Sequence, residues 1–214
     1  MGSPAGFLLG LDGGLDGKGG EPAHGLWGAP QGALPEAAGG DGEIPVDLGE
    51  QAHQDGWDVC LIATPRTFQW LDVPGLAGRT GHPVRHDYKL PGEPDLLPEP
   101  DAIIVAPATF NTINKWAAGI ADTLALGLLC EATGKGLPVV VLPYLNAAQG
   151  EHPALGEGIE RLRRLGVRVL FGPEVLPLHR PRQGKRDQFP WHLTLPALKE
   201  AAGHQTQQPP GRLQ

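Results

Sequence analysis

Residues 101–129 constrain the fold more than any other stretch, because a strand pattern, a polar turn and a helical pattern follow one another there. The run 102–106 is wholly apolar and contains two isoleucines and one valine. Such a short apolar run, bounded by Asp101 and Pro107, is typical of a strand buried on both faces of a parallel sheet. Pro107 is expected to end the strand pairing, because proline has no N–H group to donate.

A helix is predicted directly after this strand. Thr109, Asn111 and Thr112 provide side-chain oxygens of the kind that cap a helix N-terminus. Apolar residues then recur mainly at steps of three and four, as on one face of an amphipathic helix, at Ile113, Trp116, Ala117, Ile120 and Leu124. The turn therefore lies at the carboxyl end of a parallel strand and at the positive end of a helix, and both positions favour an anionic ligand.

The runs 58–63 and 138–142 predict two more buried strands, and 167–171 predicts a further strand. Helical patterns at 46–54 and from Pro153 to a stripe of Leu155, Ile159, Leu162 and Leu165 separate them, and a terminal helix broken by Pro196 is predicted over 191–201. Alternating strands and helices predict an α/β fold with a three-layer, doubly wound parallel sheet of the Rossmann-like or flavodoxin-like type. The strand 138–142 is expected beside the strand 102–106.

The two ends of the chain differ in composition from its middle. Residues 1–45 are rich in glycine and poor in apolar periodicity, which predicts a low-complexity N-terminus that is disordered or is not the biological sequence, with only 25–30 as a poor candidate for a first strand. One domain is predicted over 46–173, followed by a basic loop and C-terminal helix over 174–201 and a disordered tail over 202–214.

Charge and composition exclude several classes of function. The net charge of −7 and the lack of a dense basic run argue against a nucleic-acid partner, and no apolar run reaches the roughly 20 residues of a membrane span. Cys60 and Cys130 lie in apolar segments, so buried free thiols in a cytoplasmic protein are expected rather than a disulfide or a metal site.

Residues 107–125, PATFNTINKWAAGIADTLA, resemble the signature of the FMN-binding cysteine-decarboxylase-like flavoproteins, which include phosphopantothenoylcysteine decarboxylases and peptidyl-cysteine decarboxylases. The usual pattern is P-A-S-A-N-T followed by G-[IL]-x-D-[NT]-L. This chain has a Thr-Phe pair in place of Ser-Ala and keeps the other motif positions, and the resemblance extends more weakly over about 56–171. It implies FMN as cofactor, held by Pro107, Ala108, Thr109, Phe110, Asn111 and Thr112.

The resemblance also implies roles for residues outside the signature. A threonine at the position of Thr64 helps to hold the flavin phosphate in the family, and capping of the next helix is the alternative. A catalytic histidine precedes the central strand, and the nearest here are His82 and His86, displaced by a loop rich in proline; a solvated histidine is the alternative for His86. The motif P-x-M-N-x-x-M-W is matched at Pro143 and Asn146, which implies that Asn146 binds the substrate carboxylate, whereas a turn-forming role is the alternative.

The implied activity is oxidative decarboxylation of a C-terminal or pantothenoyl cysteine, that is, of a small-molecule or peptide substrate with a carboxylate. The family's substrate clamp contains a cysteine, but no cysteine follows Cys130 here. A non-catalytic flavin-binding or interaction subunit, and a generic nucleotide-binding domain, therefore remain alternatives. The family also implies a homo-oligomer, a trimer or a multiple of one, with Trp116 and the small residues of 117–121 at the interface or packed on their own sheet.

Overall fold

The computed structural model describes residues 7–11, 44–69, 71–181, 183 and 188–205. The strands are β1 (Phe7–Leu11), β2 (Val59–Ala63), β3 (Ala102–Ala108), β4 (Val139–Pro143) and β5 (Arg168–Val169). The helices are α1 (Ile44–Gln54), α2 (Pro65–Phe68), α3 (Val73–Thr80), α4 (Phe110–Ala117), α5 (Leu124–Lys135), α6 (Ala147–Gly150), α7 (Pro153–Arg164) and α8 (Thr194–Gln205), with a 3₁₀ helix η2 (Trp191–Leu193) before α8.

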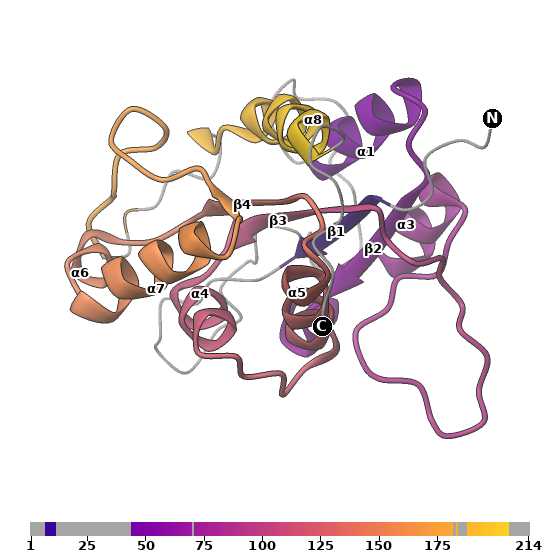
Figure 1. Ribbon diagram of the computed structural model, residues 1–214. Helices are drawn as coiled ribbons and strands as arrows, with labels where there is room; N and C mark the ends of the chain where they lie inside the picture. The colour runs from indigo at the N-terminus through magenta and orange to yellow at the C-terminus, as the bar shows by residue number, and fades with distance from the viewer. Residues whose placement is uncertain (1–6, 12–43, 70, 182, 184–187, 206–214) are drawn as a thin grey trace.

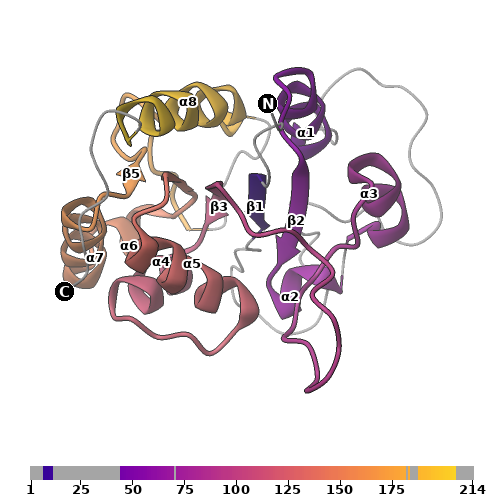
Figure 2. The same ribbon diagram turned by 45° about the vertical axis from the view of Figure 1, so that its right-hand side comes forward.

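The strands form one parallel sheet in the order β2-β1-β3-β4-β5, with helices on both of its faces (Figures 1 and 2). One core cluster joins the sheet to α4, α5 and α7, and the other joins it to α1, α3 and α8. This arrangement confirms the predicted three-layer, doubly wound fold. The predicted neighbouring positions of β3 and β4 are confirmed as well.

The strand order creates a switch point between β1 and β3. The chain leaves β1 through α1 toward β2, whereas it leaves β3 through α4 and α5 toward β4, on the opposite side and the opposite face. Because the two connections diverge, a crevice is expected at the carboxyl ends of β1 and β3, where doubly wound sheets bind their ligands.

The central strand β1 is a correction to the sequence-based prediction. The glycine-rich composition predicted no folded structure over residues 1–45, but Phe7–Leu11 pairs with β2 on one side and with β3 on the other. A run this short, set among glycines, gives no periodicity of its own, and its pairing with two long-range neighbours decides its conformation. The candidate first strand at 25–30 lies outside the described residues, as do residues 206–214 of the predicted tail.

The strand β3 is longer than predicted. Pairing with β4 was expected to end at Pro107, but after a shift in register Ala108 pairs with Pro143, and the backbone N–H of Tyr144 donates to the Ala108 carbonyl at 3.0 Å. Proline lacks only the donor, so the residue after it can still accept a bond from the neighbouring strand. The turn therefore begins at Thr109 and not at Pro107.

The helix predicted through Leu124 is in fact two helices. The first, α4, ends at Ala117, and Gly119 adopts φ +75°, a left-handed conformation that favours glycine. Thr123 then caps α5, since its hydroxyl accepts a hydrogen bond from the Leu126 N–H at 3.3 Å. Ile120 lies in the break and is 43% exposed, so the apolar period did not mark a continuous buried face.

Three smaller predictions are also corrected. Leu165 was placed on the buried stripe of α7 but is 50% exposed, because the helix ends at Arg164. The strand β5 has two residues instead of five. Pro196 does not break the terminal helix, since it lies in the first turn of α8, where its missing N–H has no intrahelical partner to lose.

Candidate functional site

The carboxyl edge of the sheet brings together the turns that follow β2, β3 and β4. The strands β2 and β3 both pair in parallel with β1, and the end of β3 pairs with the end of β4. Thr64, the 109–112 turn and the segment before Asn146 consequently lie along one edge. This is the edge at which the switch point places the crevice.

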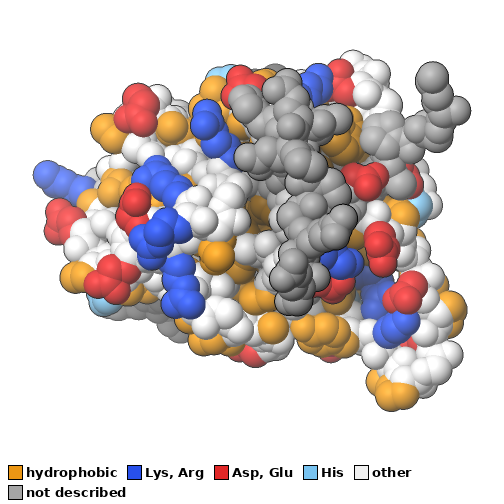
Figure 3. All heavy atoms as spheres, viewed as in Figure 1, with side chains coloured by type: hydrophobic (Ala, Val, Ile, Leu, Met, Phe, Trp, Pro, Cys, Tyr) orange, Lys and Arg blue, Asp and Glu red, His pale blue; other side chains and the backbone are white. Residues whose placement is uncertain are grey.

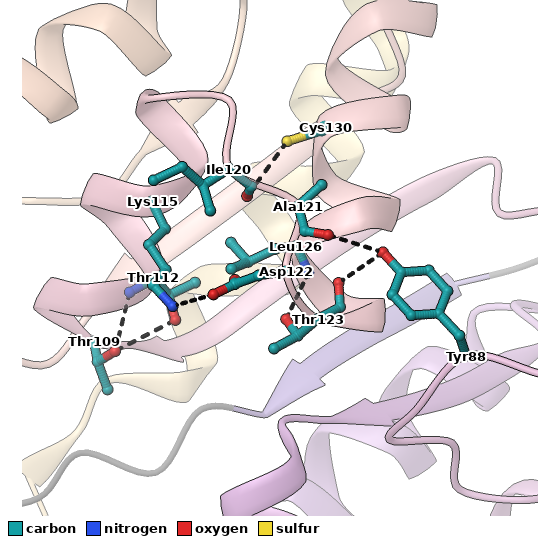
Figure 4. Close-up of polar contacts among 10 residues, drawn as sticks. All are labelled: Tyr88, Thr109, Thr112, Lys115, Ile120, Ala121, Asp122, Thr123, Leu126 and Cys130. Atoms are coloured by element: carbon teal, nitrogen blue, oxygen red, sulfur yellow. Dashed lines mark hydrogen bonds and ion pairs between the residues drawn. The ribbon is translucent and has the colours of Figure 1, made fainter.

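The turn after β3 is a capped helix start. The Thr109 hydroxyl accepts from the Thr112 N–H and donates to the Thr112 hydroxyl, both at 3.3 Å (Figure 4). Asn111 is exposed in the first turn of α4, and the N–H groups of a first turn have no acceptor within their own helix. Pro107 and Ala108 are buried in β3, so of the predicted cofactor residues only those from 109 onward present side chains beyond the sheet.

The side chain of Thr64 caps the helix that follows it. Its hydroxyl accepts a hydrogen bond from the Thr67 N–H at 3.4 Å and lies 2.9 Å from the Thr67 hydroxyl. The capping role that the sequence left open is therefore present at the site edge. A role of Thr64 toward a phosphate stays a prediction.

Asn146 caps α6 in a capping box. Its Oδ1 accepts from the Gln149 N–H at 3.0 Å, and its own N–H donates to the Gln149 side chain at 3.3 Å. The half-buried Asn146 side chain makes no further hydrogen bond within the described part of the chain, so its amide NH₂ group can donate elsewhere. Leu145, the neighbour of Asn146 in the extended segment, is buried at 3% exposure, because neighbouring extended residues point to opposite sides.

His86 reaches the same edge from outside β2. Arg85 forms a parallel bridge with Ile62, so His86 lies level with the end of β2, where its ring stacks on Phe68 with centroids 3.7 Å apart. His82 instead contacts Asp58 at 2.7 Å, near the start of β2. His86 and Asn146 are separated by four strand spacings, or roughly 19 Å, so they lie on opposite sides of the switch point without meeting.

Two histidines that the sequence did not single out lie near Asn146 and Phe110. His152 caps α7, accepting from the Ala154 N–H at 3.1 Å, and its ring packs edge-on against Phe110 with centroids 5.4 Å apart. The backbone of His179 bridges Asn146. The position of His152 directly before Pro153 at a helix start could have indicated its capping role. The pairing of His179 with Asn146 joins distant segments, so no local sequence pattern predicts it.

A surface hollow of about 670 Å³ lies at the other end of the sheet, between Pro138, Arg168 and Glu200. Of the predicted basic loop, Arg180 is exposed, while Arg182 and residues 184–187 lie outside the described residues. The described residues contain no group of three side chains suited to a metal ion, and none of their helices is long and apolar enough to span a membrane.

Solved structures with the same fold span nearly the whole chain. The FMN-dependent cysteine decarboxylase SpaF superposes with a TM-score of 0.59 at 20% identity, covering 94% of this chain and 98% of its own. The FMN-dependent cysteine decarboxylase TvaF, from thioviridamide biosynthesis, gives a TM-score of 0.61 at 17% identity, covering 93% and 97%. At such identities these likenesses establish the fold.

Sequence comparison gives the relationship. Phosphopantothenoylcysteine decarboxylase of Mus musculus is 35% identical over 137 residues, which cover 58% of this chain and 63% of that protein. The coenzyme A biosynthesis bifunctional protein CoaBC of Thermococcus kodakarensis is 28% identical over 132 residues, and the match covers only 32% of its length. The chain thus spans less than two thirds of these relatives. The Flavoprotein family matches residues 60–187, more than half of the sequence, and the chain belongs to this family.

Proposed function

We propose that this chain binds FMN at the crevice beside the 109–112 turn and uses it in the oxidative decarboxylation of a cysteine-like substrate. The observation that carries the proposal is the exposed Asn111 in the first turn of α4, next to the switch point of a chain that belongs to the Flavoprotein family. The related phosphopantothenoylcysteine decarboxylase and the structurally similar FMN-dependent cysteine decarboxylases support both the cofactor and the reaction class.

The residues at the crevice fit a flavin phosphate. Helix α4 directs its first N–H groups toward the edge, and the Asn111 amide adds a side-chain donor. Within residues 109–112 there is no lysine or arginine, so the positive potential comes from the helix N-terminus. Bound FMN would supply the two-electron oxidation of the substrate thiol, a chemistry that the side chains lack.

The chain's own residues would bind and orient the substrate. Asn146 keeps its Oδ1 in the helix cap and offers its NH₂ group to the substrate carboxylate, without introducing a charge. Because His86 and Asn146 of one chain lie about four strand spacings apart, His86 would accept the thiol proton of a substrate whose carboxylate is held by Asn146 of a neighbouring subunit. The substrate class is therefore an acyl or peptidyl cysteine with a free carboxylate, and we propose a cytoplasmic homo-oligomer as the working form.

A non-catalytic flavin-binding subunit is the second candidate. The distance of four strands between His86 and Asn146 favours it, because one small substrate within one chain cannot touch both. The two candidates share the flavin site and differ in turnover. Release of CO₂ from a peptide that ends in cysteine separates them.

Flavin binding is tested with purified protein and added FMN. The wild type should carry an oxidised-flavin absorption spectrum or quench the fluorescence of added FMN. Asn111→Ala should weaken FMN binding by about 1.5–3 kcal/mol, as expected for one hydrogen bond to a charged group, with an unchanged melting temperature. Gln51→Ala, which removes an exposed amide from α1 on the opposite face, is the matched control and should bind normally. A wild type that neither carries nor binds FMN would refute the proposal.

A further inference from the structure

Tyr88 ties the proline-rich loop after α3 to the start of α5. Its hydroxyl lies 3.2 Å from the Ala121 carbonyl and 3.1 Å from the Thr123 carbonyl, and it donates its single proton to this pair of acceptors (Figure 4). The contact joins segments that are more than thirty residues apart. It is the point at which this loop meets the family signature stretch.

The chain leaves room for this contact at Gly127. A Cβ atom at position 127 would overlap the Tyr88 hydroxyl oxygen and lie 3.2 Å from the ring carbon that carries it. Gly134, on the same helix, has nothing within 4 Å of such an atom. A glycine inside a helix lowers the stability of that helix. At position 127 the close approach of Tyr88 leaves no space for a larger side chain, which explains the glycine there. We call Tyr88, Gly127 and the two carbonyls the Tyr88 latch.

The Tyr88 latch lies at the level of the carboxyl edge of the sheet, where the candidate site is. Only residues 136–138 connect α5 to β4, so the C-terminus of α5 meets the amino end of that strand. A helix of twelve residues is about 18 Å long, close to the length of the strands it covers, so its N-terminus lies near their carboxyl ends. Tyr88 therefore contacts α5 at the level of the carboxyl edge of the sheet.

His86 lies between two fixed points. On one side the Arg85 N–H donates to the Leu61 carbonyl at 3.1 Å, and the Ala63 N–H donates to the Arg85 carbonyl at 2.8 Å. On the other side, two residues after His86, Tyr88 contacts the start of α5 through the latch. The loop then protrudes from the body of the molecule, with Leu90 68% and Leu96 52% exposed (Figures 1 and 3). The latch is thus the last contact before the protrusion.

We propose that Tyr88 is a positioning residue for His86, and that the missing side chain of Gly127 leaves the space that the Tyr88 hydroxyl occupies. The proposal rests on the proposed function, in which His86 faces the substrate. With Arg85 paired to β2 and Tyr88 held on α5, the backbone of His86 is fixed at both ends and its ring is kept on Phe68. Without the latch, the protruding loop can carry His86 away from the crevice.

The test compares Gly127→Ala and Tyr88→Phe with the matched control Gly134→Ala. Both alanine substitutions favour helix formation in α5, but only Gly127→Ala displaces the Tyr88 hydroxyl, and Tyr88→Phe removes its hydrogen bonds. In protein with labelled histidine, the His86 imidazole protons should lose their ring-current shift from Phe68 in both test variants. Trypsin cleavage after Lys89 should rise by roughly tenfold, as expected from the loss of one or two hydrogen bonds.

The control should match the wild type in both measurements. With FMN-loaded protein and a peptide ending in cysteine, the test variants should also lose between tenfold and roughly 10²-fold in kcat at unchanged FMN content. An unmoved His86 signal in Gly127→Ala overturns the latch, whether or not FMN binds. A moved signal with unchanged kcat overturns the positioning role. If the wild type releases no CO₂ at all, the proposed decarboxylation fails, while the signal and cleavage data still decide the latch.

Discussion

Asn146 uses the two ends of its amide for different purposes. Its oxygen is committed to the cap of α6, and its NH₂ group makes no hydrogen bond within the described residues. The capping and the substrate-binding interpretations therefore do not exclude each other. They can be separated by a substitution that keeps the oxygen and removes the donor.

Asn146→Asp is that substitution. Aspartate caps helices as well as asparagine does and suits the positive helix end, so the melting temperature should hold, but its charge repels a carboxylate. Asn146→Ala should instead lower the free energy of unfolding by about 0.5–2 kcal/mol. Calorimetric binding of N-acetylcysteine to the FMN-loaded protein checks the first effect, and thermal unfolding checks the second. Undiminished binding to Asn146→Asp would remove Asn146 from the substrate site.

The buried thiol of Cys60 should make the free energy of unfolding fall as the pH rises above about 9. Burial, and secondarily the charge of Asp58, raises the pKa of its thiol from 9.0 to about 12. Below pH 9 both folded and unfolded thiols are neutral; between pH 9 and about 12 only the unfolded thiol ionises, so stability falls as pH rises. The cost of Cys60→Ala should accordingly shrink between about pH 8 and about pH 10.5 in urea unfolding. A cost that stays constant over that range would contradict this account.

At the scale of elements, a partly buried hydrogen bond joins the two halves of the split helix. The indole N–H of Trp116 in α4 donates to the Thr133 hydroxyl in α5 at 3.0 Å, and that hydroxyl donates to the Leu129 carbonyl at 2.6 Å. Trp116 is 2% exposed, so its N–H depends on the Thr133 hydroxyl as acceptor. This bond fixes α5, and with it the Tyr88 latch, relative to the helix that starts at the candidate site.

Thr133→Val should therefore destabilise the protein by about 1–3 kcal/mol, the cost of leaving a buried donor without an acceptor. Thr133→Ser retains the hydroxyl and is the control. Combining Thr133→Val with Trp116→Phe should cost less than the sum of the single changes, because the second change removes the stranded N–H. Additive losses in denaturant unfolding would show that the bond contributes nothing specific.

The same elements show what the sequence could predict. Buried strands β2, β3 and β4 were found because each is a short apolar run, and helix α1 because a helical pattern covers 46–54. The strand β1 was missed, since its conformation depends on pairing with β2 and β3 and not on its own residues. The break after α4 was missed because the apolar period ran on through Ile120, which the fold exposes.

The candidate site divides in the same way. The cap at Thr109 follows from local order along the chain, so residue types were enough to predict it. The bridge that brings His86 to the edge and the contact of Tyr88 with α5 join distant segments, and a single sequence carries no signal for them. Roles toward a ligand stay predictions at every one of these positions.

At the scale of the whole molecule, the surface around the split helix bears on assembly. Trp116 and Ala117, which the sequence offered as interface residues, pack into the core of their own chain at 2% and 5% exposure. The break that follows them is exposed, with Ile120 at 43% beside small neighbours. This break, and not the buried face of α4, is the part of the predicted interface that remains available.

A homo-oligomer built on this surface should depend on Ile120. We expect the wild type to have the mass of a trimer or a multiple of one by light scattering at micromolar concentration, and Ile120→Asp to shift it toward the monomer, because a buried interface does not accommodate an unpaired carboxylate. Leu165→Asp is the matched control, since Leu165 is also an exposed leucine-sized residue at 50% but lies at the end of α7. A monomeric wild type would reject the assembly, and equal dissociation by both variants would place the interface elsewhere.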